Sequence, residues 1–335
     1  MPFRLTSSLG VQGNSFLQAH QWELSADYRW LRSRDGDFFV GTARTPPPPA
    51  LQPPGGQGIR IDVHSVSLGL TYAVTDRLRL SVAVPFQTGR LSFIEDDGLR
   101  HTERVTDFGD VTVSGNAWLL DPRSDPTGNL MLGVGLKLPT ASHRDSVEFF
   151  TKTGPAQRVA DPSIQPGDGG WGVLMQVQAF QQVFPGGLAY LSGSYLLNPR
   201  AQTEATIGRP IGLPGDPAAG TPYHLSVPDA FSLRSGVSYA VAPRWGLSAS
   251  FGGRMDGVPV QDLVNGGDAD FRRPGYSVFL DPGVDVSRGS NTFALNVPVR
   301  VHADRRANMY DRVIAVQGGG NLAKVQVLAS YTHRF

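Results

Sequence analysis

The sequence closes with KVQVLASYTHRF, residues 324–335, and this stretch decides the class of fold. Its apolar side chains alternate with polar ones, and they are Val325, Val327, Ala329, Tyr331 and Phe335. Alternation with a period of two predicts a β-strand with one apolar and one polar face, because successive side chains of a strand point to opposite sides. His333 departs from the pattern, since it stands on the apolar side. A soluble domain has little reason to end on an exposed aromatic residue, although an edge strand could also end in phenylalanine by chance.

The same alternation predicts the first strand of the chain at residues 21–31. Its apolar side carries Trp22, Leu24, Ala26, Tyr28 and Trp30. A helix would instead place apolar residues three or four positions apart. Trp22 and Trp30 are separated by roughly the height of the apolar band that a tilted membrane strand crosses. The alternative is a strand of a soluble sandwich, but such strands are usually shorter, about 5–6 residues.

Between these two stretches the same pattern recurs, and it predicts twelve strands in all. The predicted strands are residues 21–31, 59–73, 78–86, 111–119, 130–138, 171–179, 189–197, 231–241, 247–255, 276–280, 293–301 and 324–335. Short turns alternate with long Pro- and Gly-rich loops, and the predicted loops are residues 34–58, 88–108, 139–168, 198–227, 257–274 and 303–322. Proline removes a backbone donor, so these loops cannot be strand interiors.

Strict alternation of short and long connections predicts an all-β fold: a closed antiparallel transmembrane β-barrel with short periplasmic turns and long extracellular loops. An even number of strands lets the first strand pair with the last. That closure removes the unpaired edges that hydrocarbon does not tolerate. We therefore expect residues 18–335 to form the barrel, and residues 1–17 to form a periplasmic or lumenal extension.

The composition agrees with a barrel and excludes other classes. The 335 residues include 40 Gly and 26 Pro, only 18% are charged, and the mean hydropathy is -0.17. No run of 18 apolar residues predicts a transmembrane helix. The absence of cysteine excludes disulfides and thiol chemistry, and a net charge of +1 gives no reason to expect nucleic acid as a partner. The first ten residues lack the features of a signal peptide, which leaves a removed or truncated leader, or a protein that is not exported. We expect the first, with an outer-membrane location, because the barrel pattern is long and regular.

Two resemblances to known proteins support the barrel. The closing strand resembles the C-terminal signature that the barrel-assembly machinery recognises. The stretches YAVTDRLRLSVAVPF (residues 72–86), FGDVTVSGNAWLL (108–120), LGVGLKLPTA (132–141) and FLDPGVDVSRGSNTFALNVPVRV (279–301) resemble outer-membrane transporters named for the meta-cleavage pathway of phenol degradation. This resemblance implies the passage of small hydrophobic or aromatic solutes, and it implies no catalytic residue and no cofactor.

Two groups of candidate site residues follow from the alternation. Polar residues on the face opposite the apolar one are predicted to line the lumen, and they are Glu23, Asp27, Arg29, Arg79, Asp110, Asn116, Lys137, Arg234, Arg254 and Arg300. Aromatic residues near the strand ends are predicted to form girdles at the membrane interfaces, and they are Trp22, Trp30, Tyr72, Phe86, Trp171, Tyr195, Tyr239, Phe251, Tyr331 and Phe335. Unpaired buried charges are costly, so the interior is either a polar pore or a packed polar core.

The predicted function is passive transport of small solutes through the barrel, with outer-membrane lipid, the assembly machinery and the solute as partners. The alternative is a non-conducting barrel whose extracellular loops bind a macromolecule. Enzymatic signals are weak: His224 and Ser226 have the spacing of a barrel phospholipase, but they end a loop and no Asn lies in the next strand. No metal site is predicted, because Asp145, Glu148 and Asp161 lack the spacing of a cation-binding loop.

Overall fold

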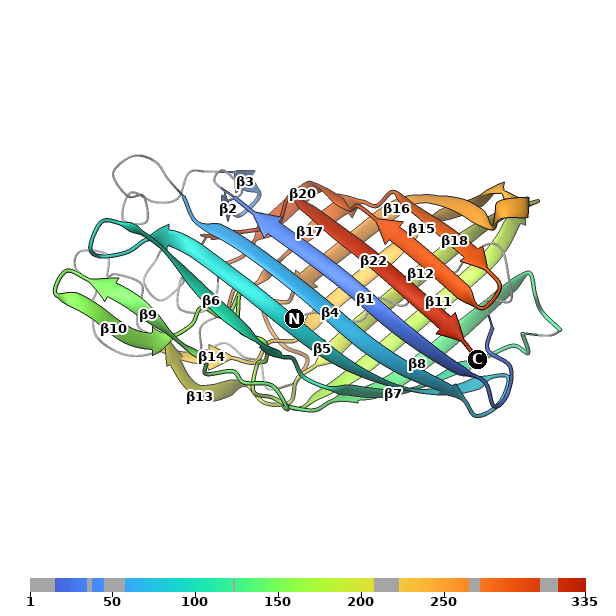
Figure 1. The fold of residues 1–335 in the computed structure, drawn as a ribbon, viewed down its shortest axis with the longest axis horizontal. Helices are drawn as coiled ribbons and strands as arrows, with labels where there is room; N and C mark the ends of the chain where they lie inside the picture. Colours follow the sequence, from blue (N-terminus) through green and yellow to red (C-terminus); the bar gives the residue numbers. More distant parts are fainter. Residues whose placement is uncertain are drawn as a thin grey trace.

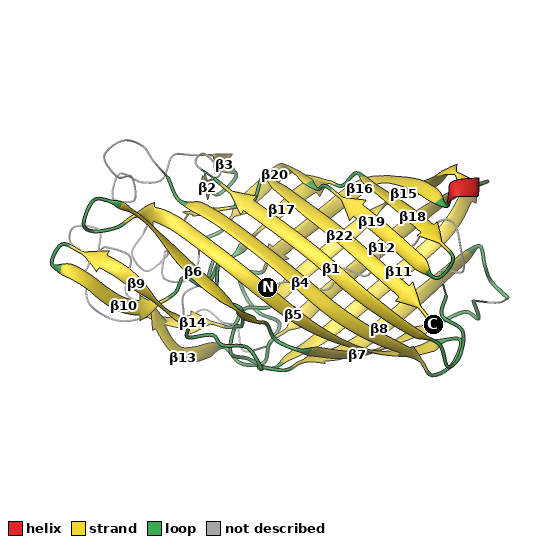
Figure 2. Ribbon diagram, in the orientation of Figure 1, coloured by secondary structure: helices red, strands yellow, loops and turns green. Residues whose placement is uncertain are grey.

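The structure is a computed structural model that describes residues 16–34, 38–44, 58–122, 124–207, 223–264, 272–307 and 319–335. Its strands tilt steeply and wrap into one closed barrel (Figure 1). Long connections and their small hairpins gather at one end, and short turns lie at the other (Figure 2). Among the described residues, no helix has the length and apolar character needed to cross a membrane.

The barrel wall has twelve strand positions, each antiparallel to its neighbours, as the sequence predicts. In order around the wall they are β1 (Trp22–Ser33), β4 (Arg60–Ala73), β5 (Leu78–Ile94), β7 (Thr112–Trp118), β8 (Gly128–Lys137), β11 (Gly172–Phe184), β12 (Gly187–Leu197), β15 (Ala230–Ala242), β16 (Leu247–Val258), β17 (Gly275–Leu280) with β18 (Gly283–Arg288), β20 (Val299–Arg305) with β19 (Asn291–Asn296), and β22 (Val325–Arg334). The first and last strands pair from Glu23 with Arg334 to Arg32 with Val325, and this pairing closes the barrel.

Two neighbouring wall positions are interrupted by proline. Pro282 separates β17 from β18, and Pro298 separates β20 from β19. Proline cannot donate to the ladder, so it ends each strand segment. The carbonyl groups of both prolines still accept hydrogen bonds, from the amides of Val297 (3.1 Å) and Gln326 (3.0 Å). Hydrogen bonding therefore continues across the interruption.

The prediction that residues 88–108 form a loop was wrong. Strand β5 runs on to Ile94, and β6 (Arg100–Phe108) returns along it. Beyond Phe86 the outward side chains become polar, beginning with Thr88 and Arg90, because this part of the hairpin extends above the apolar belt. The apolar side chains of this part, such as Leu91, lie on the inner face instead, and the backbone ladder continues.

Other predicted loops also contain hairpins. The loop at residues 139–168 holds β9 (Ser146–Thr151) and β10 (Gly154–Val159), and the loop at 198–227 holds β13 (Gln202–Ile207) and β14 (Tyr223–Ser226). Three short strands form a further small sheet, and they are β2 (Phe38–Val40), β3 (Ala43–Arg44) and β21 (Gly319–Asn321). A short 3₁₀ turn, η2 (Pro243–Trp245), joins β15 to β16.

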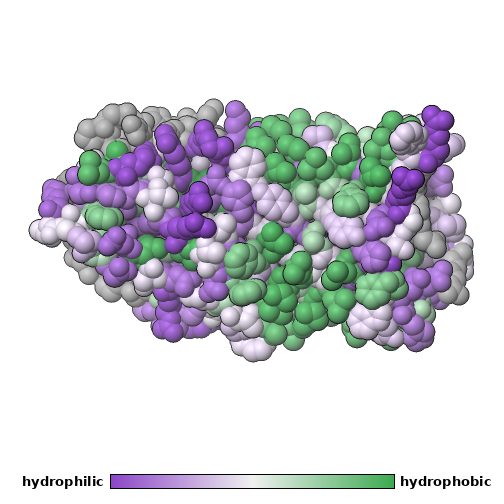
Figure 3. All heavy atoms as spheres, viewed as in Figure 1, coloured by the Kyte–Doolittle hydropathy of each residue, from purple (hydrophilic) through white to green (hydrophobic). Residues whose placement is uncertain are grey.

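On the face that Figure 3 shows, a belt of apolar side chains covers the part of the barrel next to the short turns. Exposed large apolar residues lie on strands all around the wall, so the belt continues on the other faces. Leu68, Val134 and Phe251 are typical of it, with 57%, 60% and 59% of their surface exposed. Water would not favour so large an apolar surface, whereas hydrocarbon would. The side chains on the opposite strand face are mostly polar and buried. The barrel is thus apolar outside and polar inside, as membrane barrels are.

Candidate functional site: the barrel interior

The predicted lumen-lining residues lie on the strand face opposite the belt. Asp110 is the exception, because it lies just before β7 begins. Those that are buried are Glu23, Asp110, Asn116, Lys137, Arg234 and Arg254, and those that are half-buried are Asp27, Arg29, Arg79 and Arg300. Some of them have partners outside this set of residues. Glu23 bonds to Arg334 (3.0 Å), and Arg300 donates to the carbonyl of Leu322. Their role in passage of a solute stays a prediction.

Asp256 is the centre of a polar network that crosses the interior. It accepts from Arg254 (2.8 Å) and Ser232 (2.8 Å) on its own side of the barrel. It also accepts from Gln326 of β22 (3.2 Å), and Arg29 of β1 lies 3.9 Å away. Strands β1 and β16 are not neighbours in the wall. These contacts therefore bridge the lumen and narrow it at this level.

Arg234 forms the second buried centre. Its Nε donates to Asp281 at 2.6 Å, and its guanidinium lies 4.8 Å from the centre of the Tyr190 ring. Asp281 is fully buried, and Asp285 on β18 adds another carboxylate with only 3% of its surface exposed. The sequence did not single out Asp281, because it lies in the proline interruption, or Asp256, because the predicted strand ended at Met255. Extending the alternation by one residue would have placed Asp256 inward.

An aromatic cluster occupies the interior at the end with short turns. Phe16 packs on Trp118 and Phe180, with ring centres 5.1 and 5.6 Å apart. Arg79 lies over the Trp118 ring at 5.1 Å, and Leu17 is 2% exposed. The described end of the N-terminal segment therefore lies inside the barrel, where it fills space next to β7 and β11. The rest of the predicted extension, residues 1–15, lies outside the described residues.

At the end with long loops, residues 161–166 fold inward against the wall. Ile164 is fully buried in an apolar cluster made by Val63, Leu91, Val105, Val147 and Ala160. The Gln87 amide donates to the carbonyls of Ile164 (3.4 Å) and Gln165 (3.2 Å). Gly89 of β5 provides the space: a Cβ atom there would lie 2.7 Å from the Cβ of Ile164. We call residues 161–166 the inward segment.

An ion pair fastens the inward segment to the far side of the mouth. Arg273, next to β17, donates two hydrogen bonds of 2.6 Å to Asp161. Burial opposes ionisation of Asp161, but the Arg273 guanidinium outweighs it and holds the pKa of that carboxyl below its usual range. Because this pKa is lowered, the ion pair stabilises the folded loops fully at any pH above the usual pKa of an aspartate. The stabilisation is lost only as the pH falls into strong acid. The segment thus spans from β5 towards β17.

Lys137 anchors both ends of the same long loop. It pairs with Asp168 and lies 3.8 Å from Asp110, and the Asp110 carboxylate accepts from the amide of Ala141 (3.0 Å). Two of the predicted lumen residues therefore come together, but they hold the loop in place. This contact could not be read from the sequence, since Asp168 lies 31 residues beyond Lys137.

The predicted girdle residues lie towards the two ends of the belt, apart from Phe251 near the middle of β16. At the short turns, Trp22 contacts Tyr72 with ring centres 4.6 Å apart, and Phe335 is 62% exposed. At the other end, Phe86 meets Phe108 at 5.4 Å. Tyr195 differs, because its hydroxyl donates to buried Asp229 at 2.8 Å. Trp30 and Tyr331 are half-buried, whereas Trp171 and Tyr239 are exposed. Their interfacial role stays a prediction.

The weak enzymatic signal at Ser226 belongs to a packed loop cluster. Its hydroxyl donates to the carbonyl of Ala201 (3.3 Å) and accepts from Arg272 (2.7 Å), and Arg272 also holds buried Asp262. A serine nucleophile needs a neighbouring base, and here its partner is a guanidinium. In the described part of the chain, no three His, Asp or Glu residues are grouped so that they could hold a metal ion.

These observations define the chain as an outer-membrane β-barrel. Comparison with solved structures agrees. An outer membrane channel from Pseudomonas putida F1 matches over 95% of this chain and 97% of its own, with 12% identity and a TM-score of 0.59. The likeness confirms the fold that the sequence predicted.

Two further solved structures match less well. The β domain of the Bordetella autotransporter BrkA matches over 95% of this chain and 100% of its own, with 12% identity and a TM-score of 0.49. The toluene transporter of Ralstonia pickettii matches over 99% and 92%, with 11% identity and a TM-score of 0.43. These scores are too low to add to the argument. No family model and no curated protein matches the chain, and none of these comparisons carries the phenol-pathway label.

Proposed function

We propose that the barrel provides a passive route for small solutes, controlled by segments that fold into its interior. The observation that carries this proposal is the inward segment. It packs inside the mouth on Gly89 and in the cluster around Ile164, and Gln87 and Arg273 hold it through their side chains. None of these contacts belongs to the ladders of the wall, so the segment can leave without disrupting the wall. A barrel built only as an anchor would be more simply filled by side chains of the wall itself.

The preferred solutes in this proposal are small apolar or aromatic molecules. Apolar clusters lie inside both ends of the barrel, around Ile164 at one end and around Trp118 at the other. Between them the charges are largely paired, as in Arg234 with Asp281 and Arg254 with Asp256. Paired charges do not attract an ion strongly, and arginine held over an aromatic ring offers a weakly hydrated surface.

We expect cells that lack general porins to accumulate a small labelled aromatic compound several-fold faster when they make this barrel. A sugar of similar size should enter less readily, because it must give up hydrogen bonds with water at the apolar clusters. The measurement compares initial uptake rates in cells with and without the protein, at equal amounts of folded barrel on an unheated SDS gel.

Equal uptake of the aromatic compound in both strains would reject the proposed route. It would favour the alternative, a non-conducting barrel that acts through its loops. Faster uptake of the sugar than of the aromatic compound would keep a solute route but reject the proposed solute class.

A further inference from the structure

Arginine side chains gather on the outer face of the wall, immediately beyond the aromatic end of the belt. The strand register places Arg32 of β1, Asp62 of β4, Arg90 of β5 and Arg104 of β6 in one row across four neighbouring strands. In the next row outward, Arg60 lies beside Ser92. All of these side chains are on the same strand face as the exposed belt residues, so they face away from the lumen.

The rows beneath them fix their height relative to the membrane. In the next row along the strands towards the short turns, Trp30 of β1 pairs with His64 of β4. In the row after that, Val66 of β4 pairs with Phe86 of β5. Apolar residues continue from there towards the short turns. Figure 3 shows hydrophilic atoms directly beside this end of the green belt. Since aromatic side chains favour the membrane interface, the arginines lie at the level of the outer-leaflet headgroups.

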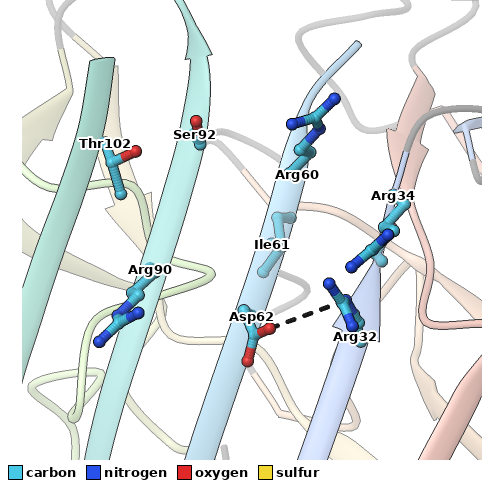
Figure 4. A pocket seen from close by; sticks show the side chains of 9 residues that line it. Arg32, Arg34, Arg60, Ile61, Asp62, Arg90, Ser92 and Thr102 are labelled. Atoms are coloured by element: carbon cyan, nitrogen blue, oxygen red, sulfur yellow. Dashed lines mark ion pairs between the residues drawn. The ribbon is translucent and has the colours of Figure 1, made fainter. Parts of the chain in front are cut away.

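The arginines also surround a hollow in this surface. A pocket of about 500 Å³ is lined by Arg32, Arg34, Arg60 and Arg90, with Asp62 as its acidic member (Figure 4). Asp62 is already engaged: it accepts from Trp30 (2.9 Å), and it lies 2.8 Å from His64 and 3.8 Å from Arg32. Its charge is thus shared among several partners, and four arginines line the pocket beside this one carboxylate.

We propose that this pocket binds the phosphate groups of a phosphorylated glycolipid of the outer leaflet, that is, of lipopolysaccharide. Arginine presents a planar fork of donors that matches phosphate oxygens, and several arginines on adjacent strands can hold more than one phosphate. A free solute on its way to the lumen would not meet this surface, because it faces the lipid. The bound lipid would fix the β4–β5–β6 side of the barrel in the membrane.

The test uses the full chain and a fluorescent lipopolysaccharide in detergent micelles. The variant is Arg60→Glu with Arg90→Glu. The matched control is Arg77→Glu with Arg244→Glu, which changes the net charge equally at exposed turns of the other end. We expect Kd to rise about tenfold or more in the variant and to stay unchanged in the control. Lipopolysaccharide without its phosphates should bind the wild type as weakly as intact lipid binds the variant.

Three outcomes would overturn the proposal. They are equal loss of binding in variant and control, undiminished binding of the dephosphorylated lipid, and competition by inorganic phosphate at the concentration of the lipid. The last result would mean that the pocket takes free phosphate. The neutral variant Arg60→Gln with Arg90→Gln guards against misfolding, since it should show the same weakening with a normal folded band on an unheated gel.

Discussion

Replacing Gly89 with valine is expected to raise the single-channel conductance several-fold. Any Cβ at this position would lie 2.7 Å from the Cβ and 2.9 Å from the Cα of Ile164, which is closer than real atoms approach. The wall strand is held by backbone ladders on both sides, whereas the inward segment is held by side-chain packing and by the side chains of Gln87 and Arg273, so the segment should yield. Planar bilayer recordings of the refolded protein measure the effect.

Gly253→Val is the matched control for that experiment. Gly253 lies in a wall strand too, but its side faces outward, and the nearest atom to an added Cβ is 3.9 Å away. Its conductance should equal that of the wild type. An unchanged conductance in Gly89→Val would show that the inward segment does not limit flow.

Replacing Arg234 with alanine is expected to lower the free energy of unfolding by about 3 kcal/mol or more, the usual cost of leaving one member of a buried ion pair alone. Asp281 is fully buried and would lose its 2.6 Å partner, and Asp285 is almost fully buried nearby. Urea unfolding in lipid vesicles, followed by tryptophan fluorescence, measures this loss.

The double variant Arg234→Ala with Asp281→Asn separates charge from packing. Removing the stranded carboxylate should restore part of the lost stability, because it leaves a neutral group in its place. Arg77→Ala, at an exposed turn, is the control and should change stability by less than about 0.5 kcal/mol. If Arg234→Ala cost no more than this control, the pair would not be structural.

Side-chain alternation made the wall predictable, whereas contacts across the interior were not. Trp22 to Trp30 and Val325 to Phe335 each carry one apolar face, so their strands and their pairing follow from sequence. The β5–β6 extension escaped prediction, because beyond the apolar belt Thr88, Arg90 and Ser92 replace the apolar outer face. The apolar residues of this extension, such as Leu91 and Val105, are buried on the inner face instead, so the pattern of a lipid-facing apolar side did not predict the strand.

The candidate site was predictable only in part, for a related reason. Alternation shows that Arg234 and Arg254 face inward, but the closing geometry of the barrel decides which carboxylate each one meets. Asp281 lies 47 positions from Arg234 in the sequence, and Arg273 lies 112 positions from Asp161. The inward segment could not be foreseen either, since its seat depends on a single glycine in β5.

The most direct test of a route through the barrel uses the adjacent residues Ser67 and Leu68 on β4. Ser67 faces the interior and Leu68 faces the lipid with 57% of its surface exposed. The chain has no cysteine, so Ser67→Cys and Leu68→Cys each introduce a unique thiol. A water-soluble thiol reagent should reduce the single-channel current of Ser67→Cys and leave that of Leu68→Cys unchanged. Current that persists undiminished in labelled Ser67→Cys would contradict passage through the interior.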